Sequence, residues 1–391
     1  MPPPPAPAAL RSRASAALWL GTVAAYAAMY VPQPFLPVLS AEFGVAPATA
    51  GLTVSALVLA IAAGSLVAGP LSDAAGRKAV MVGSMALLVV PTAGCALAAT
   101  FPQLVALRAA QGLLVPGVTA VAVAWAGEHY APADLRAAVG GIIAASVAGG
   151  LWGRVASGLV AEHRGWRAAF LLSALVTALG ALGMAVELPG GRRGGVAWRG
   201  AFAGMVRHLG DRRLLGGFLL AFCLFFGFIA VFTYLPFRLA GPPWHLSTDA
   251  VAGAYLVYLA GIAASPLAGR WAGRVEPWRL MLGGLALGVA GVALTLVPSL
   301  PAIVGGLLVL VVGMFTAQAL GPSYVNEVAR ESKGGANALY LASYYAGGTL
   351  GSWLPGLAWE AWGWPGVVAA SVAALLLAMV AVAVLCRPAA R

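Results

Sequence analysis

Two arginines lie where a membrane-buried segment would hold apolar side chains, in the stretches LRAAQG (107–112) and GGLWGR (149–154). A guanidinium keeps its proton in every protein environment, and inserting one at mid-helix costs roughly 2.5–3.5 kcal/mol. Arg108 and Arg154 are therefore expected to face the protein interior and to donate to backbone carbonyls or water. Two interpretations follow: the arginines cap carbonyls, or they form an electropositive cavity that attracts an anionic or zwitterionic solute.

No acid or histidine accompanies these arginines at the middle of a span. The chain holds 12 Asp and Glu and 4 His, and all of them fall in loops or at span ends. The sequence shows no embedded Ser/His/Asp set, no metal-ligand cluster and no phosphate-binding GxxxxGK[ST]. Three cysteines (Cys95, Cys223 and Cys386) are far apart and indicate packing rather than a disulfide or metal site. We therefore expect no enzymatic activity, no metal and no cofactor.

The composition indicates that many helices position the arginines within a membrane. The 391 residues are 61% hydrophobic and 9% charged, whereas soluble domains carry about 25% charged residues. A spanning helix needs about 20 mostly apolar residues. The spans are expected at 17–39, 48–70, 79–99, 103–127, 137–161, 167–187, 214–238, 249–269, 278–298, 302–325, 338–358 and 366–386. The predicted fold class is an all-α integral membrane protein with 12 transmembrane helices.

The spans divide the chain into two bundles. The predicted parts are a disordered tail (1–16), a six-helix bundle (17–187), a basic linker (188–213), a second six-helix bundle (214–386) and a tail (387–391). The N-terminal stretch could alternatively be a signal peptide. The second part of the linker is either an amphipathic helix on the anionic inner leaflet or an unstructured segment.

The arginines and lysines predict the orientation. With both termini in the cytoplasm, 18 of them lie in inside segments and three in outside loops, with Arg108 and Arg154 inside spans. This bias fits the positive-inside rule. It explains the net charge of +11 as topology, so we expect a lipid bilayer and no nucleic acid as partner.

The two bundles repeat one another. GGLWGRVASGLVAEHRGW, from residue 149, aligns without gaps with GGTLGSWLPGLAWEAWGW, from residue 347, and Ser352 stands where the first copy has Arg154. FLP (35–37) also matches YLP (234–236). Two halves with the same direction predict parallel repeats about an axis along the membrane normal, with a cavity at their interface.

One loop and one span carry a family resemblance. GPLSDAAGRK (69–78) resembles the signature loop G-x-L-x-D-R-x-G-R-K of the major facilitator superfamily, with Ala74 where the family has a basic residue. LRAAQG is similar to the R-x-x-Q-G motif of that family, with Arg108, Gln111 and Gly112. The Gly-rich span 5 lacks the Gly-Pro motif of drug–proton antiporters. The chain looks most like a bacterial subgroup of efflux permeases.

The resemblance implies a conformational latch at the signature loop. Its residues are Gly69, Asp73, Gly76, Arg77, Lys78 and Glu128. Asp73 would meet the N-terminal end of span 11, and Arg77 would pair with Glu128, the only acid at the cytoplasmic end of span 4. A carboxylate at a helix N-terminus gains roughly 0.3–1 kcal/mol, enough to bias a two-state equilibrium. The alternative is that these charges only set the topology of a short loop.

The resemblance also implies a solute cavity lined by spans 1, 4, 7 and 10. Its candidate residues, with those of spans 5 and 11, are Tyr26, Tyr30, Gln33, Arg108, Gln111, Arg154, Tyr234, Gln318 and Tyr344. Any single aromatic residue could equally serve packing. Many proton-coupled relatives use an embedded acid as the proton carrier. None is present here, so Asp73 and Glu128 are the remaining candidates if protons drive transport.

The expected function is secondary transport of a small organic solute by alternating access, with or without coupling to protons. Efflux of drug-like or metabolic compounds across the bacterial inner membrane is the first hypothesis. Uptake of a small anionic or polar metabolite, as permease or uniporter, is the second. A non-transporting membrane sensor is a third, although no attached signalling domain is recognised. We expect a monomer.

Overall fold

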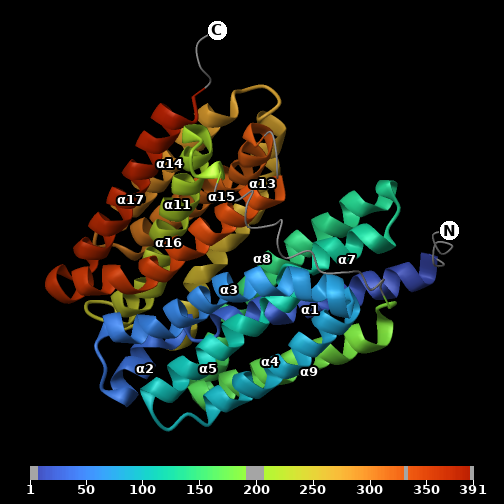
Figure 1. Cartoon of the computed structure of the whole chain (residues 1–391). Helices are drawn as coiled ribbons and strands as arrows, with labels where there is room; N and C mark the ends of the chain where they lie inside the picture. The colour runs from blue at the N-terminus through green and yellow to red at the C-terminus, as the bar shows by residue number, and fades with distance from the viewer. Residues whose placement is uncertain (1–7, 191–206, 330–332, 388–391) are drawn as a thin grey trace. The chain divides into compact units, whose positions relative to one another are not determined.

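The chain folds as long α-helices, and a computed structural model describes residues 8–190, 207–329 and 333–387 (Figure 1). Within these ranges the secondary structure is helical, with no strand. This agrees with a chain that must satisfy its backbone hydrogen bonds inside lipid, which helices do within one segment. The predicted all-α fold class is therefore confirmed.

Eleven helical segments in the described part of the chain are long and apolar enough to cross a membrane. The twelfth long helix, α16 (Lys333–Trp362), carries more polar residues, among them Ser343, Thr349 and Ser352. Several helices extend beyond the predicted spans; α3 covers Pro47–Ala75 and α15 covers Leu300–Val328. Hydropathy places the ends of a span poorly, because the helix continues into polar residues beyond its apolar stretch.

Three predicted spans are interrupted rather than continuous. The first consists of α1 (Ala8–Tyr30), η1 (Gln33–Phe35) and α2 (Leu36–Phe43). The fourth span consists of α5 (Phe101–Leu114), α6 (Pro116–Thr119) and α7 (Ala122–His129). The eighth consists of α12 (Thr248–Gly253), η2 (Ala254–Val257) and α13 (Tyr258–Trp271). In the fourth span the first of the two breaks falls at Val115, directly before Pro116, which has no N–H to continue the α-helical ladder.

The N-terminal tail is shorter than predicted. The first helix, α1 (Ala8–Tyr30), begins before residue 17, so residues 8–16 are helical rather than disordered. Residues 1–7 lie outside the described ranges, as do residues 191–206 of the linker, including most of the predicted amphipathic helix, and residues 388–391 of the C-terminal tail.

The contacts divide the chain into two compact units. Unit 1 takes in 1–35, 56–197 and 247–253, and unit 2 takes in 36–55, 198–246 and 254–391. In unit 1, α1 packs on α8 (Pro132–Arg164) and α9 (Trp166–Glu187), and α9 also runs beside α4 (Arg77–Ala96) (Figure 1). In unit 2, α11 (Arg212–Ala240) packs on α16 and α17 (Trp364–Leu385), and α14 (Pro277–Leu294) packs on α15.

The same glycine-mediated helix contact occurs once in each unit. A Cβ on Gly153 of α8 would lie 2.4 Å from the carbonyl oxygen of Ala27 in α1. A Cβ on Gly351 of α16 would lie 2.4 Å from the carbonyl oxygen of Phe226 in α11. Only glycine permits this approach of two backbones. The sequence repeat is therefore a structural repeat with a defined register.

Each unit takes in a short segment from the other half of the sequence. In unit 1 the Oε2 of Glu162 accepts a hydrogen bond from the N–H of Thr248 at 2.7 Å. In unit 2 the Oε1 of Glu360 accepts from the N–H of Ala48 at 3.3 Å. Glu162 and Glu360 are equivalent in the aligned repeat. The predicted division into 17–187 and 214–386 does not include this exchange of segments.

Candidate functional site

The first helix breaks near one end, and the break frees backbone carbonyls. α1 ends at Tyr30, and a short 3₁₀-helix follows (η1, Gln33–Phe35). Pro32 has no N–H, so the carbonyl of Ala28 cannot receive the usual bond from four residues on. Buried carbonyls without partners are costly. Side chains from α5 and α8 satisfy the carbonyls here.

Arg108 holds two of these carbonyls. Its Nη1 donates to the carbonyl oxygen of Ala28 at 2.9 Å, and its Nη2 donates to that of Met29. Nη1 also donates to Oε1 of Gln111 at 2.7 Å, and Gln111 in turn donates to Oγ1 of Thr92 at 2.7 Å. The Arg108 side chain is fully buried. The capping interpretation of Arg108 is thus the one that its geometry supports.

Arg154 lies at the same break but binds mainly side chains. Its Nε donates to Oε1 of Gln33 at 2.6 Å, and its guanidinium carbon lies 3.6 Å from the ring centroid of Tyr30. Its Nη1 also donates to the carbonyl oxygen of Gly150 at 2.7 Å. We call Tyr30, Gln33 and Arg154 the Arg154 cluster. Arg154 is 2% exposed, so the prediction that both arginines face the interior is confirmed.

Two members of this region were missed from the sequence. The hydroxyl of Ser157 donates to the carbonyl oxygen of Val31 at 2.9 Å, which satisfies a third carbonyl of the break. A Cβ on Gly150 would lie 3.2 Å from Nη1 of Arg154 and 3.4 Å from the ring of Tyr30. The glycine leaves room for the stacked pair. A serine one turn after an embedded arginine is the only sequence signal that could have pointed to Ser157.

The second copy of the repeat has none of these polar groups. In the register set by Ala27 and Phe226, Ile229 and Phe232 occupy the positions of Tyr30 and Gln33. Ser352 replaces Arg154, and its hydroxyl interacts with Oγ of Ser55 at 2.6 Å and with the Gly348 carbonyl at 3.0 Å.

The Arg108 position differs between the copies as well. The helices α5 and α15 begin after Thr100 and Ser299, and in that register Leu307 and Leu310 stand where the first copy has Arg108 and Gln111. The repeat fold is thus built in unit 2 without either arginine.

The other predicted cavity residues are divided between the units. Tyr26 is partly buried in unit 1. In unit 2, the hydroxyl of Tyr234 donates to the carbonyl oxygen of Ser352 at 2.8 Å, and Tyr344 stacks on Phe225 with centroids 3.9 Å apart. Gln318 is partly buried on α15. The structure therefore brings together Tyr30, Gln33, Arg108, Gln111 and Arg154 around one helix break, and gives Tyr234 and Tyr344 packing partners.

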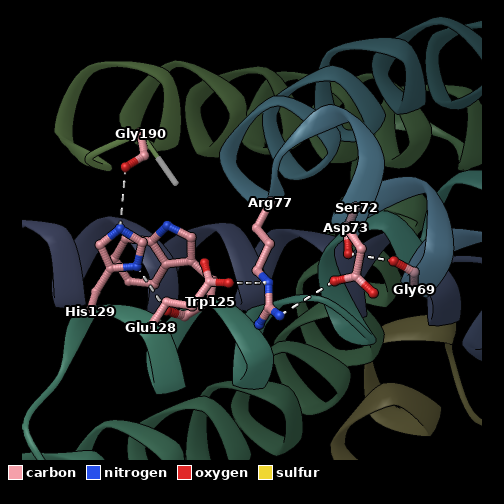
Figure 2. Close-up of polar contacts among 8 residues, drawn as sticks. All are labelled: Gly69, Ser72, Asp73, Arg77, Trp125, Glu128, His129 and Gly190. Carbon is pink, nitrogen blue, oxygen red and sulfur yellow. Dashed lines mark hydrogen bonds and ion pairs between the residues drawn. The ribbon is translucent and has the colours of Figure 1, made fainter. Parts of the chain in front are cut away.

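The signature loop joins α3 to α4 in unit 1 and forms a chain of charges (Figure 2). Nε of Arg77 lies 3.0 Å from Oε1 of Glu128, which is the pair predicted from the sequence. Nη2 of Arg77 lies 3.4 Å from Oδ1 of Asp73. Gly76 has a φ of 93°, a conformation that side chains other than glycine rarely adopt. The loop thus turns at Gly76 and places Arg77 between two carboxylates.

The residues next to both ends of this chain of charges have partners of their own. The hydroxyl of Ser72 donates to the Gly69 carbonyl at 2.7 Å beside Asp73 (Figure 2). The ring of His129 stacks on Trp125 with centroids 4.2 Å apart, directly after Glu128. Lys78 is partly buried at the start of α4. Because Asp73 and Glu128 remain partly exposed, each ion pair contributes roughly 0.2–1 kcal/mol to stability. That small free energy is more suited to a switch than to holding the fold.

The described residues offer no group of three or more His, Cys, Asp or Glu that could hold a metal ion. Cys95, Cys223 and Cys386 are buried free thiols. The polar chemistry of the described chain therefore lies in the two guanidiniums, the amides beside them and the signature loop.

Comparison with known proteins identifies the family. Residues 18–335 and 244–391 match the Major Facilitator Superfamily, and the chain belongs to it. It is 33% identical over 370 residues to the inner membrane transport protein YnfM of Escherichia coli, covering 94% of this chain and 89% of the relative. It is 30% identical over 359 residues to the MFS-type transporter YybF of Bacillus subtilis, covering 90% and 88%.

The solved structures show the same fold. A bacterial homologue of the human lysosomal transporter Spinster, in an inward-facing and occupied conformation, superposes with a TM-score of 0.80 at 17% identity, covering 97% of this chain and 96% of that one. The predicted two-bundle fold of this family is confirmed. The chain is a multi-pass membrane protein and a secondary transporter.

Proposed function

We propose that the protein exports a small organic solute across the bacterial inner membrane by alternating access, with both termini in the cytoplasm. The membrane and orientation are supported by the relative YnfM, named an inner membrane transport protein, and by the 18-to-3 distribution of basic residues. The observation that carries a solute-binding role is the Arg154 cluster. Its Gln33 and Arg154 are buried, and the cluster is absent from the equivalent place in the other copy of the repeat.

The signature loop acts in this proposal as a conformational latch. Asp73, Arg77 and Glu128 form a chain of contacts of 3.4 and 3.0 Å within unit 1, which a local change in the loop could make or break. Gly69 and Lys78 complete the loop. A latch worth about 1 kcal/mol changes the ratio of two conformations roughly fivefold, so its loss would alter rate more than stability.

Proton coupling would have to use the ends of the spans. The sequence places no acid or histidine at the middle of a span, so Asp73 and Glu128 are the candidate carriers. A carboxylate there would exchange protons with the cytoplasm.

Uptake of a small anionic metabolite is the second candidate function. Two buried guanidiniums at one helix break favour an anionic solute for either direction of transport, because positive potential in a low-dielectric site attracts anions. Direction separates the two candidates.

The experiment is transport in everted and right-side-out vesicles from cells that express the protein, with and without a pH gradient. Export predicts accumulation of solute in everted vesicles only. Accumulation confined to right-side-out vesicles would support uptake, and insensitivity to the pH gradient would exclude proton coupling.

A further inference from the structure

Gln33 carries a buried donor without an acceptor in the described part of the chain. The Gln33 side chain is fully buried, and its Oε1 accepts the bond from Arg154. A guanidinium has no lone pair to offer, so this contact fixes which end of the amide faces Arg154. The two N–H groups of Nε2 are left, and no described residue accepts from Nε2. Leaving a buried donor unsatisfied is destabilising.

The surrounding groups hold this donor in one orientation. Arg154 is itself fixed by the Gly150 carbonyl at 2.7 Å and by the Tyr30 ring at 3.6 Å. Gln33 belongs to the short helix η1, and Ser157 binds the carbonyl of Val31, two residues before η1, at 2.9 Å. The amide is therefore preorganised, which lowers the entropic cost of binding a ligand group.

The fold does not require this donor. The equivalent position in the second copy is Phe232, a buried apolar residue in the continuous helix α11. Buried polar groups that a fold can dispense with, and that are left unsatisfied, call for an explanation by water, an ion or a ligand. The guanidinium of Arg154 lies beside Nε2 and favours an acceptor with negative charge, which points to an anionic ligand group.

We propose that Nε2 of Gln33 donates to a carboxylate of the transported solute, beside the guanidinium of Arg154. The inference rests on the proposed function and names its substrate class, an organic carboxylate. A carboxylate is an acceptor with no donor of its own, so it fits an N–H group and a cation together. A carboxylate also places negative charge beside the guanidinium of Arg154, which a neutral carbonyl does not.

The test uses the purified full-length protein and two matched pairs of probes, benzoate with benzamide and butyrate with butyramide. We expect both carboxylates to raise the thermal unfolding midpoint in a saturable manner, and both amides to leave it unchanged. Gln33→Glu keeps the shape of the side chain but brings its own carboxylate to Arg154. It should fold with a midpoint at or above that of the wild type, and raise the half-saturating benzoate concentration at least about tenfold.

Two further variants control this test. Gln103→Glu is the matched control, because Gln103 is exposed in the capping box of α5, where Glu serves equally well. Its benzoate response should equal that of the wild type. Gln33→Leu, which copies the apolar character of the second repeat, should fold and lose the response. It keeps the test decisive if Gln33→Glu does not fold.

Three results would overturn the assignment: no carboxylate shift in the wild type, an equal shift by the amides, or an unaltered benzoate response in Gln33→Glu or Gln33→Leu. Proteoliposome transport separates this inference from the proposed function. If Gln33→Glu loses carboxylate binding but the wild type transports none of the carboxylates that it binds, export is refuted and the carboxylate site stands. If the wild type transports another solute, and neither benzoate nor Gln33→Glu changes that transport, the carboxylate site is refuted and the transport function stands.

Discussion

Arg154 and Ser352 occupy the same position in two copies of one helix contact, but Arg154 binds an amide in the break that follows α1, whereas Ser352 binds another hydroxyl. Arg154 donates to Gln33 at 2.6 Å, whereas Ser352 interacts with Ser55 at 2.6 Å and with its own helix at Gly348. The packing around both is set by Gly153 and Gly351. The contact can therefore be built with a small hydroxyl, and the guanidinium serves something else.

Arg108 is expected to serve the fold more than the solute. Replacing Arg108 by Ala removes its bonds to the carbonyls of Ala28 and Met29 at the break of α1. Each unsatisfied carbonyl costs about 1–3 kcal/mol, so the midpoint of thermal unfolding should fall by several degrees. Arg164→Ala, at an exposed position at the end of α8, is the control and should leave it unchanged. A wild-type midpoint for Arg108→Ala would show that the carbonyls find other partners.

The two glycines of the repeat should tolerate no side chain. An added Cβ at Gly153 or Gly351 would lie 2.4 Å from a backbone oxygen, so the helices must separate. Overpacking of this kind typically costs 1–3 kcal/mol, and Gly153→Ala and Gly351→Ala should both lower the unfolding midpoint. Gly183→Ala and Gly283→Ala have open space around the new methyl and should be neutral or more stable, because Ala favours a helix by about 1 kcal/mol over Gly. Equal changes in the unfolding midpoint for the packed and the open glycine variants would contradict the close helix contacts.

The two glutamates at the exchanged segments should stabilise their units in parallel. Glu162 accepts from Thr248 N–H and Glu360 from Ala48 N–H. Substitution by Gln keeps an acceptor but removes the charge, which is worth about 0.3–1 kcal/mol at a helix start, so Glu162→Gln and Glu360→Gln should each lower the midpoint slightly. Raising the salt concentration should shrink both effects. Glu187→Gln, at the C-terminal end of α9, should not lower it. A fall in the unfolding midpoint for only one of the two glutamate variants would mean that the two equivalent hydrogen bonds do not contribute equally to stability.

The signature loop should affect transport rate without affecting expression. Asp73→Asn removes one carboxylate from Arg77, and Glu128→Gln removes the other. We expect at least about tenfold slower transport for Asp73→Asn, a loss of about 1.4 kcal/mol in transition-state free energy, and a smaller loss for Glu128→Gln. The control is Glu276→Gln, in the corresponding loop of the second copy, where Glu276 pairs with Arg279 at 2.9 Å on the surface. Transport at the wild-type rate in Asp73→Asn vesicles would exclude a latch.

The sequence predicted the helical architecture because the signal is repeated along the whole chain. Twelve apolar stretches, the glycine pattern around Arg154 and Ser352, and the signature loop each depend on residues close together in sequence. The helical architecture needs only local periodicity and the rule that charges avoid lipid. The pairing of Arg77 with Glu128 came instead from the family resemblance of the signature loop, with Glu128 as the only acid at the cytoplasmic end of the fourth span.

The partners of the buried arginines could not be predicted in the same way. Arg108 binds carbonyls 79 and 80 residues away, and Arg154 binds an amide 121 residues away. These contacts depend on where Pro32 ends α1 and on the rotation of α5 and α8 about their axes. The exchange of segments at Ala48 and Thr248 likewise depends on tertiary packing, which hydropathy does not encode.

The most direct test of the account is the exchange of a labelled carboxylate in proteoliposomes that contain Arg154→Ser, the residue that the second repeat uses at this position. The carboxylate is the one that gives the largest thermal shift with the wild type. We predict that Arg154→Ser folds and inserts, and that its exchange falls at least about tenfold below the wild-type rate. Exchange at the wild-type rate in the folded variant would contradict a solute-binding role for the Arg154 cluster.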